Sequence, residues 1–209
     1  MRQQASTCPV PAPVPADGLP ADRARTEVSL VRVRRAVPAD REALAQMFER
    51  CTTATRHHRF HGPVKAMPER YLAEALSGSP FHHALVACLG PDTGDPHTGD
   101  PHTGNPRTGE AIEPSALPGE IVALASCRMV DEGAAELGLL IEDAWQRHGL
   151  GTRLLRDLVA HARRTGLRAL EAQLLADQAW ITGLLRPYGN CRIGNTWDGV
   201  LNVTVRLDP

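Results

Sequence analysis

The sequence has little lysine, almost no net charge, no paired cysteines and no long apolar run near its start. Lys65 is the only lysine among 23 basic residues, so the cationic side chains are nearly all arginine. Together with the abundant Ala, Gly and Pro, this composition indicates a GC-rich genome and does not point to a function. The formal net charge of -1 lacks the basic excess typical of proteins that bind nucleic acid, so nucleic acid is not an expected partner.

The cysteines and the first residues bear on the compartment. Five cysteines, widely spaced and without a Cys-x-x-Cys pair, favour reduced thiols over disulfides or a zinc knuckle. The Pro- and Ala-rich start lacks the continuous apolar core of a signal peptide or a membrane span. We therefore expect a cytoplasmic protein with no membrane partner, whose residues 1–27 form a disordered tail.

A second low-complexity tract lies within residues 90–118. A five-residue unit of the type Asp-Pro-His-Thr-Gly repeats there. Proline at a turn corner and glycine at its end predict solvated turns, so the tract is expected to be a linker inserted between two strands. Its histidines, His97 and His102, lack a surrounding set of carboxylates, and we expect no metal there.

The rest of the chain alternates strands with helices, judged from period-2 and helical spacing of its apolar residues. Strands are expected at 28–37, 81–89, 121–130, 135–141 and 167–175, with a terminal pair that includes 201–207. Helices are expected to begin at Pro38 and at Pro68, and two more to span 152–165 and about 178–185. The sum is one α/β domain, residues 28–209, with a mixed sheet.

The most informative junction follows the strand at 135–141. The chain runs through Gln146-Arg147-His148-Gly149-Leu150-Gly151 and continues as a helix. Glycines let the backbone approach a ligand, and the unpaired amides at a helix start favour a phosphate. A plain tight connection between strand and helix would use the same glycines, so the neighbouring segments have to decide between a binding loop and a simple turn.

Single residues exclude two other phosphate-binding loops. A Walker A loop needs a lysine after its last glycine, whereas Gly151 is followed by Thr152. A dinucleotide fingerprint needs Gly or Ala three residues after Gly151, where Leu154 stands, and no second βαβ unit with an acidic ribose ligand follows.

The loop resembles the Gln/Arg-x-x-Gly-x-Gly/Ala pyrophosphate loop of the GCN5-related N-acetyltransferases, the GNAT superfamily. Other segments are similar to the GNAT domains of bacterial protein-lysine acetyltransferases of the Pat type: Ala135-Glu136, Asp143-Ala144-Trp145-Gln146, 162–166, 174–176 and Arg59-Phe60. The similarity covers residues 28–208 in order. It implies a splayed central mixed β-sheet flanked by helices, and an N-acetyltransferase that uses acetyl-CoA and an amine acceptor.

The resemblance also implies the cofactor contacts. Backbone amides of the glycine turn would hold the pyrophosphate, and the preceding strand would pair with the pantetheine amides like an added strand. No metal is implied. The residues expected at the cofactor are Leu139, Leu140, Ile141, Gln146, Arg147, His148, Gly149, Leu150, Gly151, Thr152 and Gln178.

Glu136 is the expected general base. An amine arrives as an ammonium ion and cannot attack a thioester until a base accepts a proton. Glu136 interrupts an apolar strand ahead of the glycine turn and matches the acidic base of the similar acetyltransferases. The alternative is an outward-facing, merely solvated glutamate.

Several alternatives stay open. Leu185 stands where many GNAT members have the tyrosine that protonates the departing thiolate, and Tyr188, three residues on, follows Pro187, which can end the helix. A catalytically degenerate acyl-CoA-binding sensor is therefore the rival function.

The acceptor and the oligomeric state also stay open. We expect the acceptor to be a protein lysine first and a small-molecule amine as the alternative, and the protein to be a monomer or a homodimer. The histidine clusters His57-His58-x-x-His61 and His82-His83 are expected at a helix end and a strand edge, without metal.

Overall fold

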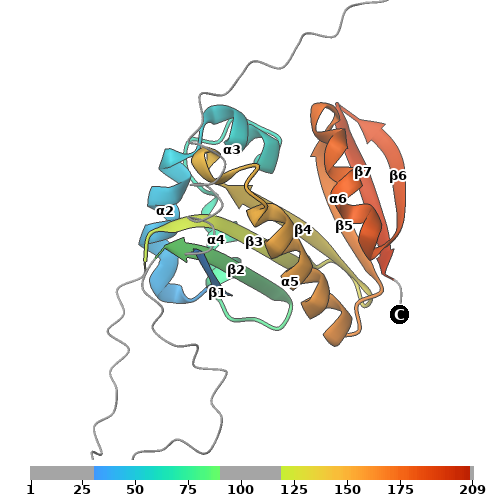
Figure 1. Cartoon of the computed structure of the whole chain (residues 1–209), viewed down its shortest axis with the longest axis horizontal. Coiled ribbons are helices and arrows are strands. Elements are labelled where there is room, and N and C mark those ends of the chain that lie inside the picture. Colours follow the sequence, from blue (N-terminus) through green and yellow to red (C-terminus); the bar gives the residue numbers. More distant parts are fainter. Residues whose placement is uncertain (1–30, 90–118, 208–209) are drawn as a thin grey trace, which may run out of the picture.

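The computed structural model describes residues 31–89 and 119–207, so the Pro/Ala-rich tail and the repeat tract lie outside the described residues. The described chain forms a seven-stranded sheet with helices on both faces (Figure 1). The strands are β1 (Val31–Arg35), β2 (His82–Leu89), β3 (Ile121–Met129), β4 (Ala134–Ile141), β5 (Ala169–Leu175), β6 (Gly189–Trp197) and β7 (Val200–Leu207). The longer helices are α2 (Arg41–Arg50), α3 (Thr53–Phe60), α4 (Glu69–Leu76) and α5 (Leu150–Arg164).

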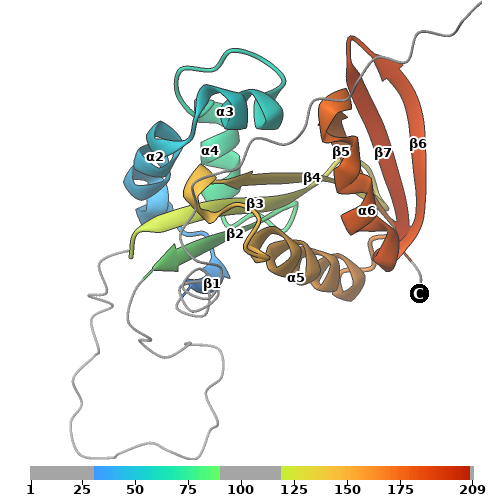
Figure 2. The same cartoon turned by 45° about the horizontal axis from the view of Figure 1, so that its top comes forward.

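The sheet is mixed, and one neighbouring pair decides its shape. The strand order is β1-β2-β3-β4-β5-β7-β6, and every adjacent pair is antiparallel except β4 and β5. These two parallel strands are paired only from Ala134–Ala169 to Glu136–Glu171. Beyond Glu136 they diverge, so the second half of β4 faces a gap in the sheet (Figure 2). The expected splayed mixed sheet is therefore confirmed.

Two apolar clusters lie on opposite faces of the sheet. The α5 helix buries Leu154, Leu155 and Leu158 against one face, because these residues repeat at helical spacing. The other face is covered by α2 and α4, and it buries Leu44 and Phe48 of α2. Figure 2 shows α5 on one side of the strands and α2, α3 and α4 on the other. None of the described helices is both long and apolar enough to cross a membrane.

Most expected elements are present with shifted ends, and one helix was missed. The α3 helix buries no residue, so it has no apolar stripe that a sequence pattern could reveal. It is instead defined by polar capping, because the Thr52 hydroxyl accepts a hydrogen bond from the Thr55 amide. The terminal strand pair is closed by Asp198 and Gly199, whose φ angles of 49° and 75° are typical of a type I′ hairpin turn.

The last expected helix is broken into short turns. Residues Ala176–Ile181 form a 3-10 helix (η3), the α-helix α6 covers only Thr182–Leu185, and a second 3-10 turn (η4, Arg186–Tyr188) contains Pro187. The expected start at Gln178 therefore lies inside a 3-10 turn. Proline lacks the amide hydrogen that a longer helix would need at this point, and it marks the end of the segment.

Histidine burial on the sheet makes the stability of the protein depend on pH. The His83 ring of β2 stacks on the His161 ring of α5, with centroids 3.6 Å apart. Burial, together with the nearby charges of His161 and Arg35, lowers the pKa of His83 to about 4. Burial also lowers the pKa of His161.

We expect the His83→Phe variant to lose part of this pH dependence. The unfolded chain has an ordinary histidine pKa of about 6.5, so it binds more protons than the folded protein as the pH falls from there to the folded value of about 4, and folding stability decreases over that window. Phenylalanine keeps the ring stack and does not titrate. Urea denaturation at several pH values measures the slope, with the exposed His57→Phe as control. Parallel profiles for His83→Phe and the unsubstituted protein would contradict the assignment.

Candidate active site

The glycine turn presents the start of α5 as a set of unpaired backbone donors. Gly149 is the N-cap of α5, with a φ of 86° and no side-chain capping bond. The first helical hydrogen bond is donated by Arg153 to the Gly149 carbonyl, at 3.1 Å. The preceding amides therefore point out of the helix without intrahelical partners. Leu150 itself is fully buried, so its contribution at this surface is its backbone.

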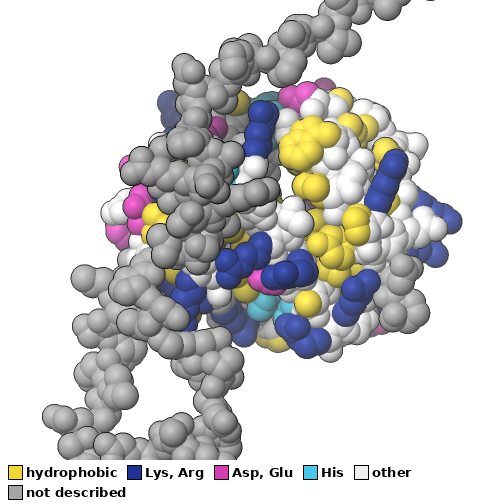
Figure 3. Space-filling model, in the orientation of Figure 1, with side chains coloured by type: hydrophobic (Ala, Val, Ile, Leu, Met, Phe, Trp, Pro, Cys, Tyr) yellow, Lys and Arg dark blue, Asp and Glu magenta, His cyan; other side chains and the backbone are white. Residues whose placement is uncertain are grey.

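Positive φ angles shape this turn. Arg147 has a φ of 64°, and Gly149 follows two residues later in the same left-handed region. Residues with a side chain rarely adopt this backbone conformation, and only glycine does so without strain. Arg147, His148, Gly149 and Thr152 are exposed. Figure 3 shows several Lys and Arg side chains spread over the face of the molecule seen in Figure 1.

The diverging half of β4 borders the same turn. A Cβ on Gly151 would lie 3.2 Å from Ile141 Cδ1 and 4.0 Å from Leu139 Cδ2, so glycine permits this close approach of helix and strand. Leu139 and Ile141 are partly buried on the α5 side, whereas Leu140 is buried in the cluster on the opposite face. The unpaired strand edge and the helix start therefore lie next to each other.

Gln146 has an internal role. Its side-chain Nε2 donates to the Ile141 carbonyl at 2.9 Å and to the Thr55 hydroxyl at 3.1 Å, so it ties the end of β4 to α3. The Asp143 carboxylate strengthens this connection by accepting from the Thr52 amide and from both threonine hydroxyls, each at 2.8 Å. Burial alone would raise the pKa of Asp143, but these hydrogen bonds lower it.

Gln178 reaches across the molecule to α3. Its Nε2 lies 3.4 Å from His58 Nε2, and the same histidine nitrogen lies 3.2 Å from the Asp177 carboxylate. The η3 turn and α3 are thereby linked on either side of the diverging strands. The role of Gln178 at the cofactor stays a prediction, and in the structure its side chain has a protein partner.

Glu136 lies on β4 at the last residue pair before the sheet opens. Its Oε2 accepts a hydrogen bond from Arg128 Nη2 at 2.5 Å, and the two residues are direct cross-strand partners on β3 and β4. The side chain is 30% exposed. Glu136 is thus partly buried and has an arginine partner that the sequence did not reveal.

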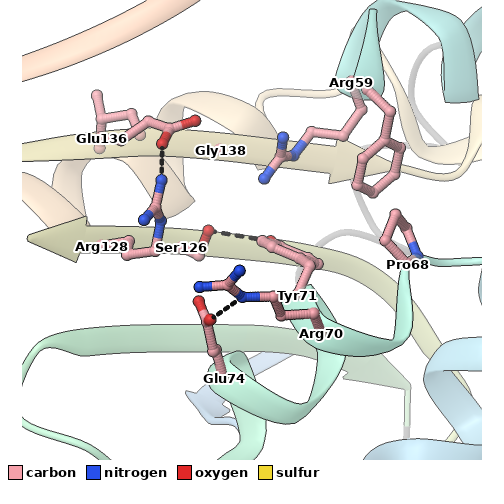
Figure 4. Close-up of a pocket in the computed structure, with 11 residues that line it drawn as sticks. Arg59, Pro68, Arg70, Tyr71, Glu74, Ser126, Arg128, Glu136 and Gly138 are labelled. Atoms are coloured by element: carbon pink, nitrogen blue, oxygen red, sulfur yellow. Dashed lines mark hydrogen bonds and ion pairs between the residues drawn. The ribbon is translucent and has the colours of Figure 1, made fainter. Parts of the chain in front are cut away.

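A cavity of about 440 Å³ opens beside Glu136. It lies between β3, β4 and the helices α3 and α4, on the face opposite α5 (Figure 4). Tyr71 of α4 lines it, and its hydroxyl lies 3.0 Å from the Ser126 hydroxyl of β3. Arg70 donates to Glu74 at 2.9 Å at the rim. The candidate base therefore faces a space large enough for a small acceptor.

Arg59 enters this cavity from α3, as Figure 4 shows. Its guanidinium carbon lies 4.9 Å from the Phe60 ring centroid and 4.8 Å from that of Tyr71. The group packs directly over Gly138: a Cβ there would lie 2.6 Å from Arg59 Cζ. The absence of a side chain at 138 makes room for the guanidinium.

Neither Leu185 nor Tyr188, the two positions considered for a proton donor to the thiolate, lies at the cavity. Leu185, at the position of the usual acid, is 3% exposed and belongs to the α5-side core. Tyr188 packs against the same core and lies in the η4 turn after Pro187. Neither lines the cavity beside Glu136, whereas Tyr71, which the sequence did not single out, does.

Within residues 31–89 and 119–207, no group of three or more His, Cys, Asp or Glu side chains is arranged to hold a metal ion. His97 and His102 lie outside the described residues. His82 is buried with its ring 5.8 Å from Tyr71, and neither ring nitrogen has a hydrogen-bond partner among the described residues. The β2 histidines do not lie at a sheet edge as expected, because β2 is an interior strand; His82 is buried and His83 is partly buried.

This combination of an opened β4–β5 pair, an uncapped helix start and a glutamate at the opening agrees with a known family. The family model "Acetyltransferase (GNAT) family" matches residues 102–186. Over this segment, which is less than half of the chain, the sequence is similar to the GNAT acetyltransferases. No curated protein sequence matches the chain.

Solved acetyltransferase structures share the fold at low sequence identity. The GNAT domain of Streptomyces lividans PAT superposes with a TM-score of 0.64 at 20% identity, covering 85% of this chain and 90% of that one. A putative acetyltransferase from Salmonella typhimurium, yncA, solved with its cofactor acetyl-CoA, has a TM-score of 0.57 at 18% identity, with coverages of 86% and 95%. The ribosomal-protein-S18-alanine N-acetyltransferase of Escherichia coli has a TM-score of 0.55 at 17% identity, with coverages of 86% and 95%.

Proposed function

We propose that this protein transfers an acetyl group from acetyl-CoA to a primary amine, with Glu136 as general base in a ternary complex. The observation that carries the proposal is the position of Glu136. It stands at the last β4–β5 residue pair, so it faces the acceptor cavity on one side of the opening. The uncapped start of α5 lies at the other end of the unpaired strand segment.

The cofactor fits the residues at this opening. The amides at Gly149, Gly151 and Thr152 supply donors for a diphosphate, and the helix start adds a favourable potential. The unpaired edge of β4 from Leu139 to Ile141 supplies backbone groups for the pantetheine amides. Arg147 and His148 are exposed beside this turn and available to a phosphate group. Gln146 and Gln178 support the site indirectly, since their side chains brace α3.

The reaction then follows from the positions of the groups. The ammonium proton of the acceptor passes to the Glu136 carboxylate, directly or through a water molecule, and the amine becomes a nucleophile. The nitrogen forms a bond to the thioester carbonyl carbon and loses its second proton to solvent, and the carbon–sulfur bond breaks. Leu185 offers no proton, so the CoA thiolate takes its proton from solvent. The Arg128 guanidinium holds Glu136 in place through Oε2.

A second candidate is a non-catalytic acyl-CoA sensor. It is favoured by the buried Leu185 in place of a tyrosine and by the engagement of Gln178 with His58. The sensor would bind acetyl-CoA at the same backbone groups and would not release CoA thiol in the presence of amines.

Calorimetry with CoA and acetyl-CoA, followed by an amine-dependent thiol-release assay, tests both candidates. We expect saturable binding and thiol release that requires an acceptor amine. Because Lys65 is the only lysine, the Lys65→Arg variant removes side-chain self-acetylation as a source of thiol. Binding without turnover on small amines and lysine peptides would favour the sensor. Folded protein that gives no binding heat would overturn both readings.

A further inference from the structure

The cavity beside Glu136 contains one positive charge that no described carboxylate neutralises. Three guanidinium groups and two carboxylates line it. Arg128 is paired with Glu136 and Arg70 with Glu74. Arg59 remains, and among the described residues it forms no ion pair. An excess positive charge in a partly enclosed space favours a ligand with a negative group.

The Arg59 guanidinium is also held rigidly. The Phe60 and Tyr71 rings contact it through cation–π interactions, and Gly138 leaves room for it on β4. Its Nε is buried and has no hydrogen-bond partner among the described residues. A buried donor without a partner is costly, so such groups in a cavity are commonly satisfied by a ligand or by water. A planar guanidinium pairs with a carboxylate through two parallel hydrogen bonds.

The spacing of Arg59 and Glu136 limits how far apart the amino group and the anionic group of the acceptor can be. Glu136 and Gly138 are two residues apart on β4, so they face the same side of the sheet at a separation of about 7 Å. The Arg59 guanidinium packs over Gly138. An amine at Glu136 and an anionic group at Arg59 must therefore belong to one compact molecule. Hydrogen bonds of about 3 Å at each end account for most of this separation, so the two groups of the acceptor must lie close together, as the amino and carboxylate groups of an α-amino acid do.

We infer that the acceptor is a small amine that carries a carboxylate next to its amino group, an α-amino acid or a close analogue, with Arg59 as the residue that binds the carboxylate. This inference rests on the proposed acetyl transfer and narrows its acceptor. The carboxylate at Arg59 orients the amino group toward Glu136. A protein lysine presents a long uncharged stem in place of this carboxylate and leaves Arg59 without a partner.

The test compares matched amines. A panel of α-amino acids is assayed for acetyl-CoA-dependent thiol release against the corresponding amino-acid amides and decarboxylated amines. We expect kcat/KM to be at least about tenfold higher for the acids, the scale on which a charged hydrogen bond discriminates between ligands. In Arg59→Gln the acids lose this advantage through a raised KM, so that acids and decarboxylated amines have similar kcat/KM, while KM for acetyl-CoA stays unchanged. Arg192→Gln, on the exposed β6 strand, controls for loss of charge.

Gly138→Ala provides a second route to the same result. Its Cβ would occupy the position of the Arg59 guanidinium and displace it without removing the charge from the protein. We expect the same loss of preference for acids, so the inference remains testable if Arg59→Gln fails to fold. Equal kcat/KM for acids and their uncharged counterparts, or a preference for lysine peptides, overturns the inference and leaves acetyl transfer intact. No turnover of any amine overturns the proposed function itself.

Discussion

Replacement of Glu136 by glutamine is expected to slow acetyl transfer by about 100-fold to 10,000-fold, the usual contribution of a positioned general base. Glutamine has nearly the same shape but cannot accept the ammonium proton. Binding of CoA should be unchanged, because the Glu136 side chain faces the acceptor cavity and the proposed CoA contacts are backbone groups of β4 and α5. Steady-state kinetics and calorimetry on the same preparation measure the two effects separately.

The Arg128 contact requires a control on this experiment. Glu136→Gln removes the partner of Arg128 and leaves a second unpaired guanidinium at the cavity. A rise in acceptor KM can therefore accompany the fall in kcat, and kcat is the diagnostic quantity. Glu132→Gln, in the exposed turn between β3 and β4, removes an equal charge away from the cavity and should leave kcat unchanged. Unaltered kcat in Glu136→Gln would show that another group accepts the proton.

The part of this site that the sequence predicted depends on local patterns. Glu136 is recognisable because it interrupts an apolar strand, and the Gly149-x-Gly151 turn because it joins that strand to an amphipathic helix. Both signals lie within some 15 residues of each other, so no knowledge of long-range contacts is needed. The order of strands and helices is accessible for the same reason, since each apolar period is local.

The cavity was not accessible in this way, because distant segments form it. Arg128 faces Glu136 through the register of β3 against β4, and a shift of one residue would place it on the other face. Tyr71 contacts Ser126 across 55 residues of sequence. The sequence shows Arg59 only as part of a motif, and the room for its guanidinium depends on Gly138, a glycine that neither turns nor caps the chain. Such contacts exist only after the layers have packed.

The Gly149→Val variant is expected to weaken CoA binding by at least about tenfold. Gly149 has a φ of 86°, where a β-branched residue is strongly disfavoured, so the turn must change its backbone conformation. That change reorients the amides of the following residues, which are the proposed diphosphate donors. No atom lies within 4 Å of the added Cβ, so backbone conformation and not a clash causes the effect.

The other end of the same helix offers a matched control. Gly166 follows the last residues of α5, has a φ of 76° and likewise has nothing within 4 Å of an added Cβ. Gly166→Val should therefore lower the thermal stability by a similar amount, while CoA affinity measured by calorimetry stays at the value of the unsubstituted protein. If both variants lose CoA affinity equally, the effect reflects general destabilisation. Loss of affinity in Gly149→Val alone places the anionic part of the cofactor at the start of α5. The two variants carry the same substitution, at a glycine of similar positive φ, beside the same helix, and they differ only in the end of the helix that is changed.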